Sequence, residues 1–430
     1  MQYIDYVNLN YKPKKSDLIC EYYIEPAKNE NIKRAAGAVA SESSVGTWTD
    51  VTTMTKKSKR LAAKVYDIDF INKVVKIAYP VDLFEPGNMP QILSSIAGNI
   101  FGMRIVNNLK LLDVHFPDSI LKSFKGPHLG IFGIRKKLRI IERPFVGTIV
   151  KPKVGLNPKE QAQVAFNAWL GGCDIVKDDE NLSNMKFNRF KDRIDQVLKA
   201  KEKAERLTGE KKMYMPNITA ETVEMIKRMK YVKEAGGICV MIDILSLGWG
   251  AVQTVRNYNE DLKLVLHAHR AGHAALTRNN RHGISMLTIA KCARLIGVDQ
   301  LHIGTVVGKM HGKAEVPIID QEIEDQLIVP KPGMSLIKGG HVLEQNWHNI
   351  NPVFAVCSGG LNPLHMPYLI NHLGRNIIIQ MGGGIHGHPK GTVAGAKAAR
   401  QAVDATLKGM SLEDYSKNHK ELAQAIKQWG

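Results

Sequence analysis

Short apolar segments recur eight times between Phe145 and Met381, and polar or glycine-rich turns and helix-like stretches separate them. The segments are Val146–Val150, Asp174–Val176, Met213–Met215, Ile238–Ile244, Leu262–Leu266, Gln300–Ile303, Val353–Val356 and Ile377–Met381. Helices are expected at Pro158–Leu170, Phe187–Arg206, Ala220–Glu234, Ser285–Leu295 and Met366–Leu373. Eight strand–helix units over roughly 260 residues are typical of an α/β fold of the (β/α)8 TIM-barrel type. A doubly wound sheet is the alternative, but no G-x-G-x-x-G motif follows an early strand.

The first part of the chain has a different pattern. Residues 1–125 mix strand-like runs with helix-like runs, which predicts an α+β N-terminal domain ahead of the barrel. The strands are expected at Leu18–Ile24, Ala62–Ile68 and Lys73–Tyr79, and the helices at Asn31–Ser41 and Met89–Ala97. Residues 126–430 would form the barrel domain with a helical C-terminal tail at Ser411–Gly430, and the basic stretch Phe116–Lys137 would link the two domains.

The net charge of +18 indicates either a nucleic-acid partner or an anionic substrate. The basic residues are spread along the chain, and base-stacking aromatic residues are not interleaved with them. A cationic pocket for phosphates is therefore favoured, and a basic nucleic-acid-binding or scaffold protein is the less favoured alternative.

Five scattered cysteines without C-x-x-C spacing predict reduced, mostly buried thiols. No apolar run approaches the roughly 18 residues of a membrane span. The N-terminus also lacks a signal-peptide layout. We therefore expect a cytoplasmic protein with no membrane or nucleic-acid partner.

Polar groups gather where the predicted strands end. The second strand runs from apolar Ile175 and Val176 into Lys177, Asp179 and Glu180. Two carboxylates form a hard-oxygen site suited to Mg²⁺. The lysine fits beside a cation only as an ion-pair partner or after chemical conversion.

Other strand ends add charge and glycine. These ends carry Lys151, Lys153, His267, His269, Arg270, His302, Ser358–Gly360 and Gln380–Gly384. Successive glycine amides can approach an anion closely, and loops after the last two barrel strands commonly bind phosphate. Arg270 and His302 could hold a second anion, so a substrate with two phosphates is predicted. Residues 304–312 would form a mobile lid with Lys309 at its tip.

Several motifs, in order, resemble those of the ribulose-1,5-bisphosphate carboxylase/oxygenase (RuBisCO) large chain. They are Glu42-Ser-Ser-Val-Gly-Thr-Trp48, Gly98-Asn-Ile-Phe-Gly102, Lys151-Pro-Lys153, Gly171-Gly-Cys-Asp-Ile-Val-Lys-Asp-Asp-Glu180, His267-Ala-His-Arg270, Gly304-Thr-Val-Val-Gly-Lys309, Ser358-Gly-Gly360 and Gly382-Gly-Gly384. The resemblance covers nearly the whole chain. It implies carboxylation, with competing oxygenation, of ribulose 1,5-bisphosphate to 3-phosphoglycerate through an enediolate.

The resemblance also implies the catalytic roles. Lys177 would react with activator CO₂ to form a carbamate, and this carbamate, Asp179 and Glu180 would hold Mg²⁺. The carbamate would be the base for the first proton abstraction. Lys151 and His269 would transfer further protons, and Lys309 would stabilise the new carboxylate.

Further residues would bind substrate by the same resemblance. From the barrel these are Lys153, Arg270, His302, Ser358, Gly359, Gly360, Gln380, Met381, Gly382 and Gly383. Glu42 would orient Lys309, and Thr47, Trp48 and Asn99 would contact substrate in a neighbouring subunit. The implied assembly is a homodimer or a ring of dimers without small subunits.

Ile149, Ile303 and the short C-terminus are most similar to the archaeal form III enzymes of this family. Those enzymes are associated with AMP and nucleotide salvage. The nearest alternative is a RuBisCO-like enolase or isomerase acting on a sulfur-containing sugar phosphate. The presence of Glu42, Arg270, His302 and Lys309 argues against it.

Overall fold

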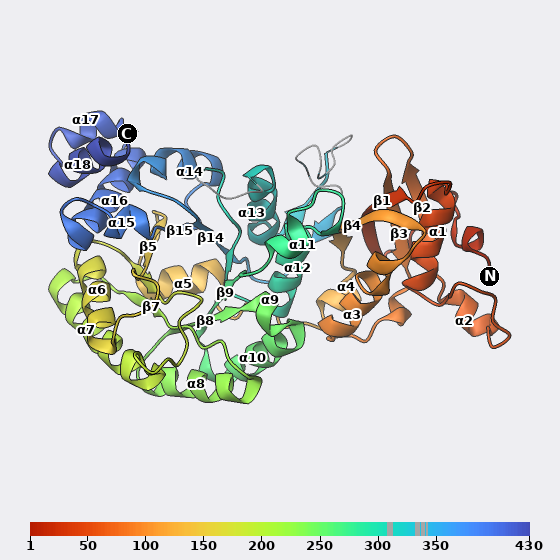
Figure 1. The fold of residues 1–430 in the computed structure, drawn as a ribbon, viewed down its shortest axis with the longest axis horizontal. Helices are drawn as coiled ribbons and strands as arrows, with labels where there is room; N and C mark the ends of the chain where they lie inside the picture. The colour runs from red at the N-terminus through yellow and green to blue at the C-terminus, as the bar shows by residue number, and fades with distance from the viewer. Residues whose placement is uncertain (308–312, 332–335, 337–339, 341–342) are drawn as a thin grey trace. The chain divides into compact units, whose positions relative to one another are not determined.

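The computed structural model describes residues 1–307, 313–331, 336, 340 and 343–430. The chain divides into two compact units (Figure 1). Unit 1 comprises Met1–Gly126, Gly272–Ile296 and Asp325–Ile350. Unit 2 comprises Pro127–Ala271, Gly297–Glu324 and Asn351–Gly430.

Unit 2 is built on an eight-stranded parallel sheet in the order β7-β6-β5-β15-β14-β11-β9-β8. Its strands are β5 (Phe145–Ile149), β6 (Ile175–Lys177), β7 (Met213–Met215), β8 (Cys239–Asp243), β9 (Val265–His269), β11 (Gln300–His302), β14 (Phe354–Ser358) and β15 (Ile377–Gln380). The two edge strands meet beyond β7, where the amide of Ile218 donates to the Met241 carbonyl (3.0 Å) and the Met241 amide to the Pro216 carbonyl (2.8 Å). These bonds close the sheet into a barrel.

Helices cover the outside of this barrel (Figure 1). They are α6 (Pro158–Leu170), α7 (Phe190–Thr208), α8 (Thr222–Glu234), α9 (Ile244–Leu247), α10 (Trp249–Leu262), α13 (Val316–Glu324), α14 (Met366–Leu373), α15 (Gly383–His386) and α16 (Gly391–Leu407). The tail forms α17 (Leu412–Ser416) and α18 (Lys420–Trp429). Asn157 begins α6 by accepting hydrogen bonds from the amides of Lys159 and Glu160, and Pro158 occupies its first turn.

One further helix, α5 (Gly130–Leu138), closes the amino-terminal end of the barrel. Its buried residues Ile131, Ile134 and Leu138 form one apolar cluster with residues at or near the strand starts, including Phe145 and Ile175. The interior of the barrel is filled by apolar side chains at this end, and polar groups gather at the opposite end, where the strands finish.

Unit 1 contains a five-stranded sheet in the order β10-β4-β1-β3-β2. Its strands are β1 (Leu18–Pro26), β2 (Lys64–Asp69), β3 (Val74–Tyr79), β4 (Val106–His115) and β10 (Gly283–Ile284), and β12 (Leu327–Ile328) and β13 (Gln345–Asn346) pair separately. Its helices are α1 (Ile32–Glu42), α2 (Lys56–Arg60), α3 (Met89–Ile96), α4 (Asp118–Leu121), α11 (Ala274–Thr277) and α12 (Met286–Ile296).

The predicted fold class, a (β/α)8 barrel preceded by an α+β domain, is confirmed. Several element ends differ from the sequence-based expectations by one to three residues, and three differences are larger. The fifth barrel strand is Val265–His269 rather than Leu262–Leu266, because α10 continues to Leu262. Strand β4 was not predicted, and the expected linker Phe116–Lys137 contains α4 and most of α5.

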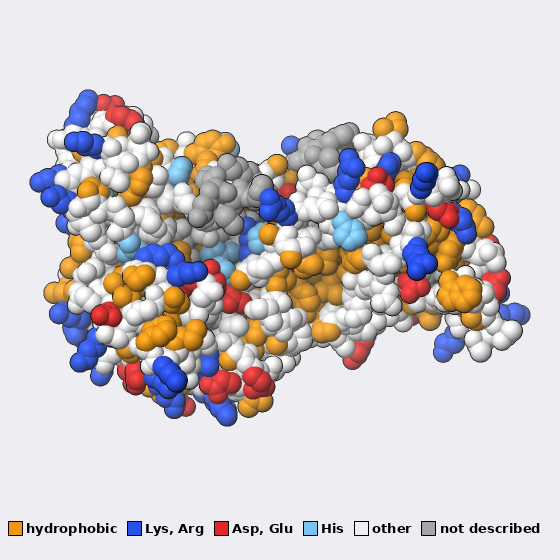
Figure 2. Space-filling view, viewed as in Figure 1, with side chains coloured by type: hydrophobic (Ala, Val, Ile, Leu, Met, Phe, Trp, Pro, Cys, Tyr) orange, Lys and Arg blue, Asp and Glu red, His pale blue; other side chains and the backbone are white. Residues whose placement is uncertain are grey.

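The cysteines and the basic surface residues are distributed as the sequence indicated. All five cysteines are buried free thiols, as predicted. Basic side chains are scattered over the face shown in Figure 2 rather than gathered into one stripe. Within the described part of the chain, no helix is both long and apolar enough to cross a membrane.

Candidate active site

Lys177 is the last residue of β6, and only 1% of its side chain is exposed. Its Nζ donates to the carbonyl oxygen of Asp178 (2.8 Å) and lies 3.5 Å from Oε2 of Glu180. Burial lowers the pKa of Lys177 below the usual lysine value, and the carboxylates of Glu180 and Asp179 offset this only in part. The amine is therefore neutral more often than an exposed lysine at the same pH.

Asp179 follows the end of β6 and pairs with Lys151, which follows β5. The Nζ of Lys151 donates to Oδ2 of Asp179 at 2.9 Å, and Asn181 donates to the other carboxylate oxygen. Burial raises the pKa of Asp179, but the hydrogen bonds from Asn181 and Lys151 outweigh it, so the pKa lies below its usual value. A Cβ on Gly382 would lie 2.9 Å from Cε of Lys151, so this glycine leaves space for the lysine.

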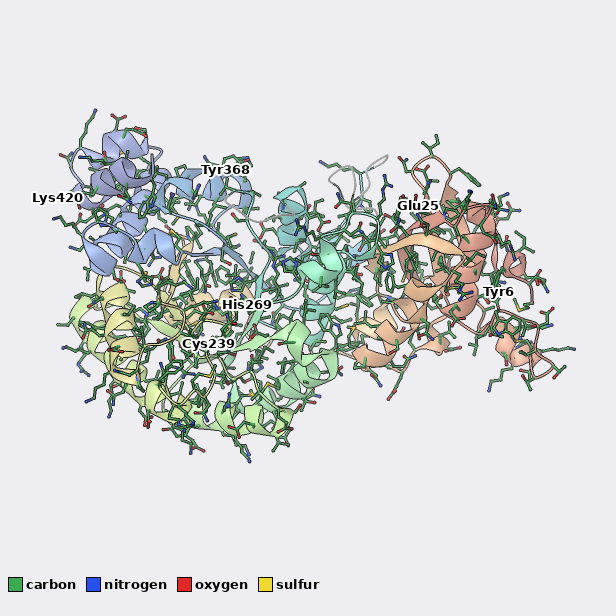
Figure 3. The ribbon with its side chains drawn as sticks, viewed as in Figure 1. Tyr6, Glu25, Cys239, His269, Tyr368 and Lys420 are labelled. Atoms are coloured by element: carbon green, nitrogen blue, oxygen red, sulfur yellow. The ribbon has the colours of Figure 1, made fainter. Side chains whose placement is uncertain are left out.

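His269, labelled in Figure 3, is the last residue of β9. It lies between two carboxylates. Its Nδ1 is 2.9 Å from Oδ1 of Asp243, and its Nε2 is 3.6 Å from Oε2 of Glu180. The Ala271 amide also approaches Nδ1, at 3.2 Å, but the Asp243 contact is shorter and its acceptor is charged. Nδ1 therefore carries the proton in the neutral ring, which leaves Nε2 free to act as a base.

His302 belongs to a buried chain of hydrogen bonds. Its Nε2 lies 3.0 Å from Nε2 of His267, and its Nδ1 lies 2.9 Å from the Ser358 hydroxyl. The other nitrogen of His267 is 2.8 Å from Oε1 of Gln300, an acceptor, so His267 donates there. His302 then donates to His267 and accepts from Ser358, and burial holds the pKa of both rings well below 6.5. Both nitrogens of neutral His302 are thus engaged, and the ring orients the Ser358 hydroxyl.

Arg270 is 8% exposed beside Gly304. Burial lowers its pKa to about 10, with Glu315 acting in the opposite direction. Gly304 has φ +100°, and a Cβ there would lie 2.6 Å from Nη2 of Arg270. The glycine therefore permits both this turn and the close approach of the guanidinium.

The loops after β14 and β15 contact each other directly. A Cβ on Gly384 would lie 2.2 Å from the carbonyl oxygen of Leu361. Gly359 and Gly360 have φ angles of +124° and +76°, a backbone that only glycine adopts readily. Such a turn can present successive amides to an anion.

Two predicted substrate contacts on β15 and just beyond it are enclosed. Gln380 and Met381 are 1% and 0% exposed. The Met381 amide donates to Gly147 (3.0 Å), and its carbonyl accepts from the Thr148 hydroxyl (2.6 Å), so the barrel already uses its backbone groups. Oε1 of Gln380 has no hydrogen-bond partner among the described residues.

A family model described as "Ribulose bisphosphate carboxylase large chain, catalytic domain" matches residues 130–429, and its N-terminal-domain counterpart matches residues 5–120. The chain belongs to the RuBisCO large-chain family. The predicted family and the prediction of an enzyme of this kind are confirmed.

Archaeal members are among its relatives. The ribulose bisphosphate carboxylase of Methanosarcina mazei is 51% identical over 427 residues, which cover 99% of each chain. That of Methanocaldococcus jannaschii is 50% identical over 435 residues, covering 99% of this chain and 100% of the relative.

Solved structures give the same family. The dimeric Rubisco of Hyperthermus butylicus is 46% identical with a TM-score of 0.94, covering 100% of this chain and 99% of that one. An octameric, sulfate-bound Rubisco of Pyrococcus horikoshii OT3 is 44% identical with a TM-score of 0.92, covering 100% and 97%.

The remaining predicted site residues are more dispersed. Lys153 is exposed after β5. Glu42, Thr47, Trp48 and Asn99 lie in unit 1, where Trp48 is 82% exposed. Lys309 and the tip of the predicted RuBisCO lid lie outside the described residues.

The candidate metal ligands Lys177, Asp179 and Glu180 suit a hard cation only after the amine of Lys177 has been modified. Among the described residues, no group of three or more His, Cys, Asp and Glu side chains could hold a metal ion. Asp179 and Glu180 supply two carboxylates, and the third neighbour, Lys177, is an amine. The set therefore suits the Mg²⁺ expected for a RuBisCO once Lys177 bears an anionic oxygen.

Three residues beneath this RuBisCO site were not predicted to have roles. Asp178, next to Lys177 in the chain, accepts from the amide of Asn217; Asp243 contacts His269, and His267 contacts His302. Asp243 ends β8 as a carboxylate at a strand end, which the sequence could have indicated. The roles of Asp178 and His267 depend on partners from other strands.

Proposed function

We propose that the protein carboxylates ribulose 1,5-bisphosphate to two molecules of 3-phosphoglycerate. The observation that carries this is Lys177, a buried amine beside Asp179 and Glu180 at the barrel's strand ends. The full-length similarity to ribulose bisphosphate carboxylases supports the substrate.

Activation would begin at Lys177. The lone pair of its neutral amine attacks the carbon of CO₂, an N–C bond forms, and the nitrogen loses one proton to solvent. The product is a carbamate anion, which converts an amine into an oxygen donor beside Asp179 and Glu180. Bound Mg²⁺ would polarise the carbonyl and hydroxyl oxygens of the sugar.

The proton transfers would then involve the Lys177 carbamate, Lys151 and His269. An oxygen of the Lys177 carbamate takes the proton from C3 of the substrate, leaving the enediolate. Carbon 2 of the enediolate forms the new bond to CO₂, water adds at C3, and the C2–C3 bond breaks. Lys151 donates the final proton to C2, and Nε2 of His269 accepts a proton as the second base.

The two phosphates would bind at separate places on the rim. Arg270 serves one phosphate directly, and His302, whose two nitrogens are engaged by His267 and Ser358, serves it by holding the Ser358 side chain in place. The amides at Ser358–Gly360 and at Gly382 and Gly383 serve the other, because positive φ angles at Gly359 and Gly360 suit an anion-binding turn. Lys153 completes this proposed set, and the enclosed Gln380 and Met381 would support the backbone that leads to Gly382.

The complete site would need a second subunit. Trp48 is 82% exposed, which suits a residue that covers substrate in a neighbouring copy together with Thr47, Asn99 and Glu42. Lys309, oriented by Glu42, would stabilise the new carboxylate. A homodimer or a ring of dimers without small subunits is proposed, and the dimeric and octameric relatives support it.

The decisive experiment incubates the protein with labelled CO₂, ribulose bisphosphate and Mg²⁺ and identifies the product. Labelled 3-phosphoglycerate is expected. Metal-dependent enolisation without fixation would overturn the assignment and favour the enolase or isomerase alternative. Substrate-dependent O₂ uptake tests competing oxygenation. Label transfer from AMP into 3-phosphoglycerate in cell extract tests a role in nucleotide salvage.

A further inference from the structure

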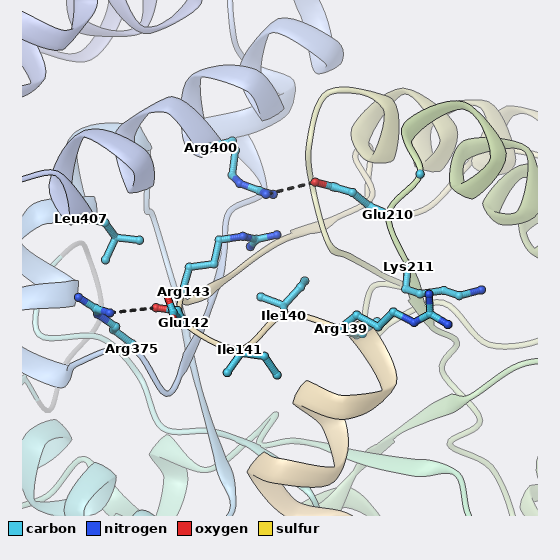
Figure 4. A pocket seen from close by; sticks show the side chains of 12 residues that line it. Arg139, Ile140, Ile141, Glu142, Arg143, Glu210, Lys211, Arg375, Arg400 and Leu407 are labelled. Atoms are coloured by element: carbon cyan, nitrogen blue, oxygen red, sulfur yellow. Dashed lines mark hydrogen bonds and ion pairs between the residues drawn. The ribbon is translucent and has the colours of Figure 1, made fainter.

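A cavity lies beside the starts of the barrel strands, and Figure 4 shows the residues that line it. Its volume is about 620 Å³, and all of its lining residues belong to unit 2. The segments 138–143 and 209–211 and Arg375 precede strands β5, β7 and β15, and Arg400 and Leu407 come from α16. The cavity therefore opens where strands begin, whereas Lys177 and His269 stand where strands end.

The lining is strongly basic. Five cations, Arg139, Arg143, Lys211, Arg375 and Arg400, face two carboxylates, those of Glu142 and Glu210. Glu210 is already paired with Lys212 (2.6 Å) and Arg400 (3.2 Å). Arg143 and Arg400 pair with Asp174, and Lys211 lies 3.8 Å from Glu205, so the positive charge that remains for a ligand is mainly that of Arg139 and Arg375.

Two of the arginines are held in place by a buried carboxylate. Asp174 is completely buried and receives a bidentate pair of hydrogen bonds from Arg143, at 2.6 and 2.7 Å. Arg400 lies 3.4 Å from the same carboxylate and donates to the carbonyl of Gly172 at 3.1 Å. One buried acid thus fixes two guanidinium groups beside each other, which holds their positive charge at the cavity wall.

Two more arginines are exposed at the cavity. Arg139 and Arg375 form no ion pair among the described residues, and Arg375 donates only to the backbone oxygen of Glu142, at 3.4 Å. Because like charges repel, a bound anion would lower the electrostatic repulsion between these arginines.

The cavity also has an apolar side. Ile140, Ile141 and Leu407 line it, and Ile141 is 68% exposed. An isoleucine with this exposure beside four arginines offers a contact surface for an apolar or aromatic group. The volume falls within the roughly 300–1,000 Å³ typical of small-molecule sites.

We propose that this cavity binds a phosphate ester whose organic part packs against Ile140 and Ile141. The phosphate lies among Arg139, Arg143, Arg375 and Arg400. The site is distinct from the carboxylation site, and the proposal does not depend on that function.

Phenyl phosphate is a suitable probe, and hydrogen exchange read by mass spectrometry locates it on the intact protein. Peptides covering 138–143 and 207–212 should gain protection saturably. Peptides covering 177–181 and 268–272 report separately on the candidate active site. Protection confined to the latter peptides, or no saturable protection, would overturn the proposal.

A charge-matched pair of variants tests the residues. Arg139→Gln with Arg375→Gln should weaken phenyl phosphate binding at the cavity at least about tenfold, since two phosphate donors are lost. Lys420→Gln with Lys427→Gln removes the same charge from exposed positions on α18 and should leave binding unchanged. Equal weakening in both pairs would show general charge attraction and would refute a built site. Inorganic phosphate should bind more weakly than phenyl phosphate, and equal affinity would refute the apolar contact.

Discussion

The Nε of Arg193 lies 3.0 Å from Oδ2 of Asp178, and both side chains are completely buried. Asp178 also accepts hydrogen bonds from the Tyr214 hydroxyl (2.6 Å) and from the amide of Asn217 (3.1 Å). Because Asp178 stands between Lys177 and Asp179 in the chain, this network fixes the segment that carries the candidate ligands.

Replacing Asp178 by asparagine should lower the free energy of unfolding by about 3–5 kcal/mol. The reason is that Arg193 would keep its buried charge without the carboxylate. Urea denaturation measures the change, and the exposed helical substitution Glu202→Gln is the control. A loss below about 1 kcal/mol would contradict the importance of this ion pair.

Lys177→Met should reduce carbon fixation about a thousandfold or more, because no carbamate can form and a metal-site donor is lost. Methionine keeps the length of the side chain, so the fold should persist. Fixation of labelled CO₂ gives the activity, and carbon NMR with labelled CO₂ should show a carbamate signal only in the parent protein. The exposed substitution Lys199→Met on α7 should change neither measurement. Retained fixation in Lys177→Met would refute the metal model.

The buried histidines should make stability depend on pH between about 7 and 5. Burial holds the pKa of His267 and His302 well below 6.5, and lowers that of His386 to about 4. As the pH falls below 6.5, these histidines become protonated in the unfolded chain but stay neutral in the folded protein. The free energy of unfolding therefore decreases. The free energy of unfolding should drop by up to about 1.4 kcal/mol per pH unit for each ring.

The carboxylates with lowered pKa values, such as Asp179 and Glu180, lose their stabilising effect only nearer their ordinary values of 3.8 and 4.5. Glu21, whose pKa burial raises to about 8, acts in the opposite direction over the higher window, so a histidine variant is needed to isolate the contribution of histidine. Urea unfolding of His267→Gln at several pH values should show a smaller slope than the parent protein. An identical slope would show that His267 does not contribute.

Gly382→Ala should lower carboxylation at least about tenfold with little loss of stability. The new Cβ would lie 2.9 Å from Cε of Lys151 and would displace its ammonium from Asp179. A double-mutant cycle provides the control, because the same substitution should have no further effect when Lys151 is already alanine. Additive losses would mean that Gly382 acts independently of Lys151.

Much of the barrel could be predicted because its strands are buried and apolar. Helices Pro158–Leu170 and Met366–Leu373 have the predicted bounds, since proline lies in the first turn of each and glycine follows each end; Asn157 also caps the first of them. The fifth strand was misplaced because His267 and His269 are polar yet belong to the strand itself. Strand β4 carries polar Asn108, Lys110 and Asp113 without regular alternation with its apolar residues, which obscured it.

The sequence indicated which residues gather at the strand ends but not how they pair. The contacts of His267 with His302 and of Asp243 with His269 join different strands. Each depends on the stagger between parallel strands, which the barrel sets and no local pattern encodes. The basic cavity was missed for a related reason, because its arginines are scattered between positions 139 and 400.

The interleaving of unit 1 along the chain constrains how genes of this kind can be recombined. The Nζ of Lys291, on α12, lies 2.6 Å from Oδ1 of Asp113 on β4, and both side chains are buried. A crossover near codon 126 would inherit Asp113 from one parent and Lys291 from the other. Chimaeras that keep this acid and base matched should fold, whereas mismatched ones would bury a lone charge.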